Sequence, residues 1–349
     1  MRKKFLAIIL SLTLIIGASL PLTGCGGNRR IYIYVPDGAP LIAAAHMFYE
    51  GEDVVYSGGT RRVRYVQTTG QLIGSALVRN RPPDFALAPI NLAATNYNTM
   101  GNFVFGGVAL RGVFHIVENI TLGNNRAQNL SDLVGETIFA YQENMSPGIV
   151  LETVLEKAGL DINRKTAGTT PNPNAVNIVY LADNGQARDA LMGQMGPAIG
   201  NARFALIADP VVSALVMQDR FEVAFNMQQE WYNLFGFSFP QVAIMVRSTI
   251  AQREPALANA VIDMISRSIA KAAANPAETA RIIETLESVY LPPTPVITNF
   301  LGSDRGSEVF SFSNVSESRT AVKEFLNVLH QRGAPIGGRV PDDGFFFGG

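Results

Sequence analysis

Side chains whose type and spacing could do chemistry are scarce in this sequence. It has no G-x-S-x-G nucleophile elbow, no G-x-x-x-x-G-K-[ST] phosphate loop and no G-x-G-x-x-G dinucleotide fingerprint. The histidines His46, His115 and His330 lack the spacing of metal ligands, so packing or surface roles are expected for them. We therefore expect no catalytic residues, no metal and no cofactor, and predict that the protein is not an enzyme.

Small loops rich in proline and glycine stand at the carboxyl ends of predicted strands. In open α/β sheets that edge faces the ligand crevice. Each loop alone could be an ordinary strand-to-helix turn, but five on one predicted edge favour a ligand site. The expected ligand-binding residues are Asp37, Gly38, Ala39, Thr68, Thr69, Gly70, Pro89, Ile90, Asn91, Ser146, Pro147, Gly148 and Asp209.

The loop Ser146-Pro147-Gly148 carries the most specific signal of the five. A serine cap followed by proline fits the first turn of a helix, and the amides of Gly148 and Ile149 would then be donors for a ligand acceptor. The alternative is that Ser146 accepts those bonds as a cap and no ligand reaches them.

The charge of the ligand is not fixed by the sequence. The predicted cleft loops carry Asp37, Glu143, Asp183 and Asp209, and Arg111 is the nearest candidate cation. An anion would have to use helix N-termini, such as those after Gly70 and Pro147. The carboxylates could equally bind a cationic or heterocyclic amine, or cap turns and face solvent.

The elements that must position these loops alternate between short apolar runs and amphipathic segments. This pattern is typical of parallel sheets covered by helices. Strands are predicted at residues 31–35, 63–66, 85–88, 113–117, 137–141, 176–181, 204–208, 222–225 and 241–246. Beyond residue 247 the pattern is mainly helical, and Asn275-Pro276-Ala277-Glu278 marks a helix start with an N-cap. The run Phe345-Phe346-Phe347 fits either a docked strand or a loose tail.

The chain is longer than one hydrophobic core usually supports, so two lobes are expected. After the strand near Val117, asparagine and glycine mark a break at 123–129, and the strand near Val246 predicts a return crossing. We therefore expect residues 29–116 and 247–349 to form lobe one and 117–246 to form lobe two. The two crossing strands would act as the hinge, and a ligand bound between the lobes would close it.

The N-terminus predicts export and lipid anchoring. Arg2, Lys3 and Lys4 precede an apolar run, which is typical of a signal peptide. Leu22-Thr23-Gly24-Cys25 then resembles the bacterial lipobox. We expect a signal peptide at 1–24, lipidation at Cys25 and a tether at 25–28, which would place the protein on the extracytoplasmic face of the cell membrane.

The composition of the chain indicates which partners and attachments are expected. The chain carries a net charge of −1 and becomes more acidic when the basic signal residues are removed, so nucleic-acid binding is not expected. Cys25 is the only cysteine, so no intramolecular disulfide can form. No later apolar stretch approaches the roughly 18 residues that span a bilayer, so the lipid would be the only membrane attachment.

Several motifs in order resemble the substrate-binding components of ABC importers in the nitrate/sulfonate/taurine and thiamine-precursor (NMT1/THI5-like) superfamily. They are the lipobox, Val35-Pro36-Asp37-Gly38-Ala39-Pro40, Ala88-Pro89-Ile90-Asn91-Leu92-Ala93-Ala94, Ser146-Pro147-Gly148, Glu230-Trp231, Phe239-Pro240-Gln241 and Pro341-Asp342-Asp343-Gly344-Phe345. The resemblance implies a type II periplasmic-binding fold, with two α/β lobes joined by two crossing strands. The segments 196–203 and 292–305 match no part of the pattern.

The function implied is the extracytoplasmic solute-binding component of an ABC importer. It would capture a small molecule between the lobes and deliver it to the permease and ATPase subunits, as a monomer held at the membrane by its lipid. Two alternatives use the same scaffold, because a fold does not fix function. They are an exported enzyme and a lipoprotein that senses a ligand or binds a partner protein.

Overall fold

The computed structural model describes residues 30–196, 202–286, 288 and 291–348. The predicted signal peptide, Cys25 and the tether lie outside the described residues. Within that part of the chain, no helix combines the length and the apolar character needed to cross a membrane.

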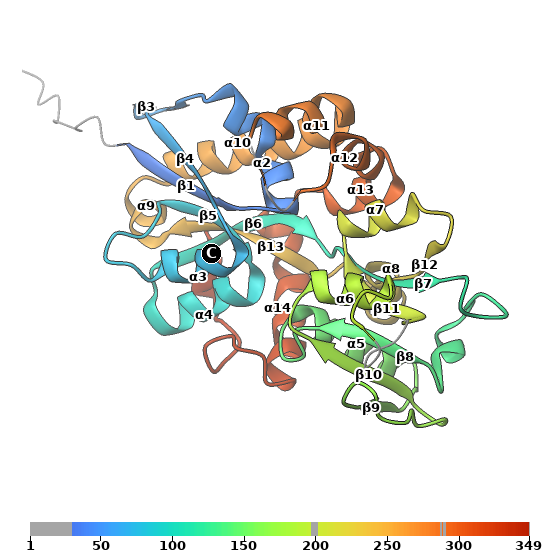
Figure 1. Cartoon of the computed structure of the whole chain (residues 1–349). Coiled ribbons are helices and arrows are strands. Elements are labelled where there is room, and N and C mark those ends of the chain that lie inside the picture. The colour runs from blue at the N-terminus through green and yellow to red at the C-terminus, as the bar shows by residue number, and fades with distance from the viewer. Residues whose placement is uncertain (1–29, 197–201, 287, 289–290, 349) are drawn as a thin grey trace, which may run out of the picture. The chain divides into compact units, whose positions relative to one another are not determined.

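The first sheet, which we call the sheet of lobe 1, draws its strands from two separate parts of the chain (Figure 1). Its order is β4-β1-β5-β13-β6. β1 runs parallel to β4 and β5, whereas β13 is antiparallel to both of its neighbours. The strands are β1 (Ile31–Pro36), β4 (Val63–Thr68), β5 (Phe85–Pro89), β6 (Phe103–Arg111) and β13 (Pro240–Arg247). A small hairpin of β2 (Val54–Tyr56) and β3 (Gly59–Arg61) stands apart from it.

The second sheet, that of lobe 2, comes from the continuous stretch between the two parts of the first. Its order is β12-β7-β11-β8-β10-β9, and β7 is antiparallel to both β11 and β12. The strands are β7 (Phe114–Asn119), β8 (Thr137–Tyr141), β9 (Ile162–Arg164), β10 (Val176–Leu181), β11 (Phe204–Ala208) and β12 (Phe221–Asn226). The predicted strands are confirmed, while β2, β3, β6 and β9 were not foreseen.

Helices follow the strands as the alternating pattern predicts. In lobe 1, α2 packs on α10, and both contact β6, while α4 contacts β5, β6 and β13. The helices that follow lobe 1 strands are α2 (Ala39–Glu50), α3 (Gly70–Leu77), α4 (Ile90–Met100), α9 (Ser248–Arg253) and α10 (Pro255–Ala274). Those of lobe 2 are α5 (Ser146–Lys157), α6 (Asn184–Leu191), α7 (Val211–Val216) and α8 (Met227–Phe235). One-turn helices cover Leu130–Leu133 and Asp343–Phe345.

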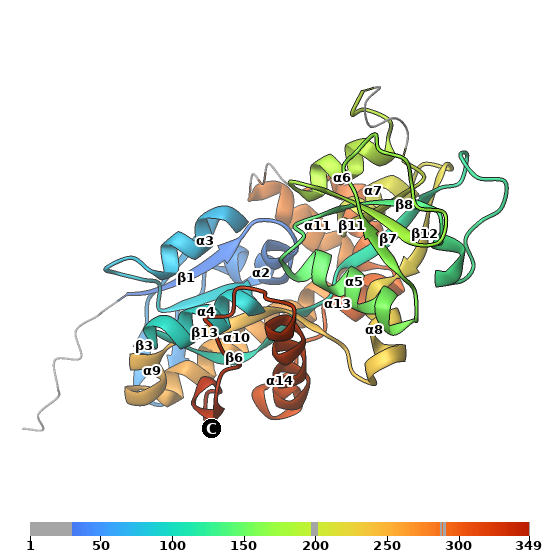
Figure 2. The ribbon, with the colours of Figure 1, turned by 90° about the horizontal axis from the view of Figure 1, so that it is seen from below.

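The region after α10 is helical, as expected. It contains α11 (Pro276–Thr285), α12 (Thr294–Leu301), α13 (Asp304–Val309) and α14 (Val315–Gln331). α11 starts where the sequence predicts, but the side chain of Asn275 makes no capping bond. α12 contacts both α11 and the lobe 2 helix α7, so the unmatched segment 292–305 reaches the other lobe. α14 contacts β6 and β13 (Figure 2).

The chain crosses between the sheets a few residues earlier than the sequence predicts. Val117 pairs with Ala205 and Val223 inside the second sheet, and Val246 pairs with Phe85 and Val104 inside the first. The crossings are therefore residues 112–113 and 236–239. A single apolar run covers both the first crossing and β7, so hydrophobicity alone cannot separate them.

The two crossings touch. A Cβ atom on Gly112 would lie only 2.0 Å from Cζ of Phe239, so the ring occupies the space that a side chain at 112 would need. Phe239 also stacks on Phe114 and on Phe325 of α14, and packs against the buried ring of Trp231. This aromatic cluster holds the crossings against the C-terminal helix.

The phenylalanine run near the C-terminus is docked. Phe345 and Phe346 are buried, Phe346 forms a bridge to Phe105 of β6, and the amide of Phe347 donates to the carbonyl of Phe105 at 2.9 Å. Ser313 forms a second bridge, to Val108 of the same strand. Residues far along the chain thus pair with the open side of β6.

Candidate ligand-binding site

A cavity of ≈ 390 Å³ lies at the strand ends of both sheets. Lobe 1 contributes residues that follow β1 and β5, together with Gly70 at the start of α3. Lobe 2 contributes residues that follow β8 and β11, together with Asn184 at the start of α6. Both lobes therefore share one cavity at the edge that the sequence predicts for a ligand.

The structure brings most of the predicted site residues together. Eight line the cavity: Asp37, Ala39, Gly70, Pro89, Asn91, Ser146, Pro147 and Asp209. The remaining five, Gly38, Thr68, Thr69, Ile90 and Gly148, are not among its lining residues. Thr69 instead caps α3, because its hydroxyl accepts a bond from the amide of Leu72 at 3.2 Å, and the side chain of Ile90 is fully buried.

The interpretation of the 146–148 loop needs correction. α5 begins at Ser146, its N-cap is Met145, and no side chain caps it. The amide of Ile149 donates to the carbonyl of Met145 at 3.0 Å, so it is not a donor for a ligand. Gly148 is buried, and a Cβ atom there would lie 2.5 Å from the carbonyl oxygen of Glu143. From the sequence, the first turn of this helix is expected to be exposed and to tolerate a larger residue at 148; this expectation is wrong because the preceding loop folds back onto the helix.

Three nearly buried polar side chains line the cavity without a hydrogen bond to any described residue. Asn91 is 3% exposed, and Tyr141 and Ser146 are each 5% exposed. Buried polar groups are normally hydrogen-bonded, so these groups are available to a ligand or to water. The buried Oε1 of Gln241, another lining residue, also lacks a partner within the described part of the chain.

Several lining residues were missed by the sequence analysis. Tyr141 and Gln142 stand at the end of a strand that was predicted, so the strand-end rule itself could have found them. Asn184 holds the loop after β11, because its Oδ1 accepts from the amide of Ala208 at 2.9 Å. Gln241 lies within the return strand and was named only as part of the motif Phe239-Pro240-Gln241, without a role in the site. The others are Pro36, Pro40, Leu110, Val113, Phe114, Met145, Ala208 and Val242, which are mostly apolar.

Among the described residues, the Asp37 carboxylate of lobe 1 contacts only neutral donors. Its Oδ1 accepts from the amide of Gly38 at 2.8 Å and from the hydroxyl of Ser288 at 2.5 Å, and its Oδ2 accepts from Gln67 at 3.4 Å. No lysine, arginine or histidine occurs among the described residues that line the cavity.

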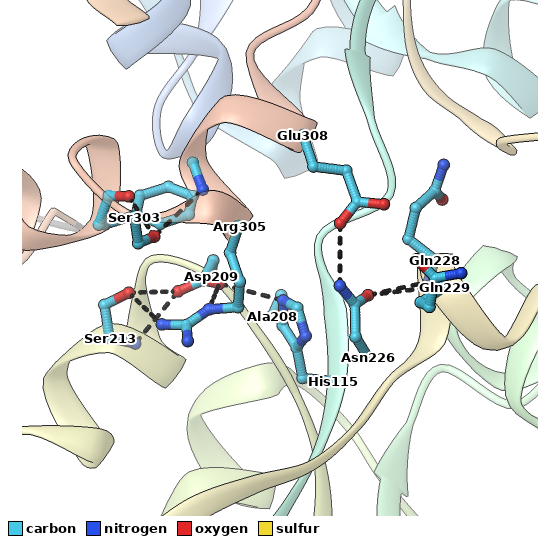
Figure 3. A network of polar contacts seen from close by, with 12 residues as sticks. His115, Ala208, Asp209, Ser213, Asn226, Gln228, Gln229, Ser303, Arg305 and Glu308 are labelled. Atoms are coloured by element: carbon cyan, nitrogen blue, oxygen red, sulfur yellow. Dashed lines mark hydrogen bonds and ion pairs between the residues drawn. The ribbon is translucent and has the colours of Figure 1, made fainter.

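The Asp209 carboxylate of lobe 2 has the opposite surroundings (Figure 3). Its fully buried Oδ2 lies 3.1 Å from Nε2 of His115 and 3.2 Å from Nε of Arg305 in α13. The hydroxyl of Ser213 donates to Oδ1 at 2.7 Å, and Arg305 donates to that hydroxyl at 3.1 Å. The charge of Asp209 is therefore already balanced inside the protein.

This network sets the ionisation of Asp209. Burial alone would raise the pKa of the carboxyl group, but His115, Arg305 and Ser213 stabilise the carboxylate and lower the pKa below its usual value. Burial raises the pKa of Tyr141, so its hydroxyl stays protonated and can donate. Nearby, Asn226 donates to Glu308 of α13 at 2.9 Å, a second polar link between α13 and lobe 2 (Figure 3).

The other charged residues of the predicted cleft have local partners. Glu143 pairs with Arg164 at 3.3 Å, and Asp183 caps α6 by accepting from the amide of Gln186. Arg111 donates to Ser313 and is not a lining residue. Residues 197–201 of the unmatched segment 196–203 lie outside the described residues, and Arg203 at its end bonds Glu118 and Glu136 of lobe 2, each at 2.6 Å.

His46 and His330 have the packing and surface roles that the sequence predicts, whereas His115 pairs with Asp209. His46 is buried in α2, where its Nε2 lies 2.9 Å from the hydroxyl of Thr279. Burial lowers the pKa of His46. His330 is exposed in α14.

No protein-family model and no curated protein matches the sequence. Solved structures do match. An ABC transporter structure from Parabacteroides distasonis has a TM-score of 0.66 at 20% identity, covering 91% of this chain and 97% of that one. The periplasmic aliphatic sulphonate binding protein SsuA of Escherichia coli has a TM-score of 0.63 at 17% identity, covering 90% and 92%. The alkanesulfonate-binding protein SsuA of Xanthomonas axonopodis pv. citri, bound to MOPS, has a TM-score of 0.59 at 14% identity, covering 91% and 96%.

These likenesses establish the fold. The chain has two α/β lobes of the periplasmic-binding-protein type, as the sequence predicts. Among proteins of that type, it is similar to the SsuA binding proteins over nearly the whole described chain.

Proposed function

We propose that this protein is the extracytoplasmic solute-binding component of an ABC importer. One observation carries the proposal: a cavity at the strand ends of both lobes is lined by buried polar groups with unused hydrogen-bonding capacity, namely Asn91, Tyr141 and Ser146. Small-molecule sites are typically apolar clefts with a few such groups that orient the ligand. The similarity in fold to ABC transporter binding proteins supports the same function.

The proposed division of the chain follows the strand topology. Lobe 1 would comprise residues 31–111 and 240–349, and lobe 2 residues 114–235. The adjacent crossings at 112–113 and 236–239 would act as the hinge. A ligand that touches both lobes binds the closed state better than the open state, so it shifts the population toward closure.

A ligand screen tests the function. A library of small polar metabolites would be scanned by thermal shift, since a ligand at 100 times its Kd adds about 2.7 kcal/mol of stability. Hits would be measured by calorimetry on the parent and on Asn91→Leu, which removes one unused polar group and keeps the number and branching of side-chain heavy atoms. We expect at least one hit, a loss of affinity in the variant, and a smaller radius of gyration at saturation. Binding without any effect of Asn91→Leu would place the ligand elsewhere.

We further propose that the protein is anchored by a lipid on Cys25, acts as a monomer, and delivers its ligand to permease and ATPase subunits. The signal-like N-terminus and lipobox support the anchor. Replacing Cys25 with Ser and fractionating the cells tests it. The variant should leave the membrane fraction, and its full retention there with the signal removed would contradict lipid anchoring.

A further inference from the structure

The charge distribution across the cavity restricts the ligand further, on the assumption that the proposed function holds. The described lining residues include two formal charges, Asp37 and Asp209. Asp209 is balanced by Arg305 and His115, neither of which lines the cavity. Asp37 contacts only the neutral donors Gly38, Gln67 and Ser288. The lobe 1 wall therefore carries one carboxylate that no described cation compensates.

The lobe 2 wall carries no uncompensated formal charge among the described residues. Helices begin at the cavity on both walls, α2, α3 and α4 in lobe 1 and α5 and α6 in lobe 2, so helix N-termini do not distinguish the two walls. Tyr141 and Ser146 add two hydroxyl groups that are nearly buried and have no hydrogen bond to a described residue. Hydroxyls can donate to an acceptor, and the pKa of Tyr141 keeps its proton in place.

We propose that the ligand is a small dipolar amine that lies across the cleft. Its protonated nitrogen contacts the Asp37 carboxylate in lobe 1, and an acceptor group at its other end contacts Tyr141 and Ser146 in lobe 2. A ligand with only negative charge would bring that charge to a wall whose formal charge is already negative. The apolar lining, including Phe114 and Pro147, suits the carbon body between the two ends.

Two probes whose charged groups have opposite signs test the proposed binding mode on the unaltered protein. 4-Aminobutanamide carries an ammonium group and a carboxamide, whereas succinamate carries a carboxylate and the same carboxamide. Binding of each would be measured by calorimetry and by thermal shift at low salt. We expect the amine to bind and succinamate to bind at least about tenfold more weakly, given the strength of charge-assisted hydrogen bonds. Equal or tighter binding of succinamate, or no binding of the amine, would overturn the proposal.

Variants of the protein then test which residue contacts each end of the ligand. Asp37→Asn should weaken 4-aminobutanamide about tenfold, and Tyr141→Phe should weaken it several-fold, because a charged contact contributes more than a neutral one. Glu143→Gln is the matched control, since this carboxylate pairs with Arg164 and does not line the cavity. Unchanged affinity in Asp37→Asn would contradict the assignment. If the library finds a ligand while the amine probe fails, the proposed function stands and the dipolar amine is wrong.

Discussion

Two aspartates, one in each lobe, line the cavity from equivalent positions after a strand, but their exposure and their partners differ. Asp37 follows β1 and Asp209 follows β11. Asp37 is partly exposed and meets neutral donors, whereas Asp209 is buried and meets Arg305 and His115. The difference comes from α13, a helix far along the chain that reaches lobe 2. A carboxylate at a strand end is thus available to a ligand only where no distant segment neutralises it.

The largest expected effect is that of removing the partner of Asp209. Arg305→Met removes the arginine partner of a buried carboxylate and leaves it with His115 and Ser213, and breaking a buried ion pair costs about 3 kcal/mol or more. We expect such a loss in the free energy of unfolding, measured by urea denaturation. Arg126→Met is the control, because its pair with Glu222 is exposed and should contribute less than about 1 kcal/mol. Equal losses in both variants would mean that Asp209 does not depend on Arg305.

Two glycines in the first turns of helices, one in each lobe, extend the comparison. A Cβ atom on Gly148 in lobe 2 would meet the backbone of Glu143 at 2.5 Å, whereas one on Gly70 in lobe 1 would meet nothing within 4 Å. Gly148→Ala should therefore cost about 2 kcal/mol through overpacking, and Gly70→Ala should be near neutral. Thermal unfolding without ligand measures both. If Gly148→Ala does not lower the stability, the loop before α5 can move away from the helix.

We expect the free energy of unfolding to depend on pH in the acidic range through the carboxylate of Asp209. Because the pKa of Asp209 is lowered in the folded protein, its ionisation stabilises the fold above the ordinary pKa, and this stability is lost as pH falls through the folded value. Each proton taken up on unfolding changes stability by about 1.4 kcal/mol per pH unit. Asp209→Asn should remove one such contribution below about pH 4. Urea denaturation at several acidic pH values measures the slope, and identical slopes in parent and variant would exclude this role.

The smallest effect on stability is expected at Asp37. Its side chain contacts only neutral donors at the rim, so Asp37→Asn should change the free energy of unfolding by less than about 0.5 kcal/mol. Urea denaturation in the absence of ligand provides the measurement. A large loss would mean that Asp37 supports the fold, as Asp209 does, and the contrast between the two carboxylates would disappear.

Local sequence was enough to predict the alternating elements and the sheet edge that holds the cavity. Strand ends such as Pro36 and Pro89, each followed by a helix, predict that edge because their turns depend only on neighbouring residues. The partners of Asp209 could not be predicted in this way, because Arg305 lies in a segment that matched no pattern. Gly148 was misjudged for a related reason: its crowding comes from the fold of the loop before it, which composition does not show.

Pairing along β6 has a consequence for behaviour at high concentration. β6 ends the first sheet, and an unpaired strand edge is a template for pairing between molecules. The bridges from Ser313 and Phe346 occupy that edge, and the bond from Phe347 to Phe105 adds to them. The protein thus uses its own late residues to block intermolecular sheet growth. Release of these residues would expose the strand edge to pairing with another molecule.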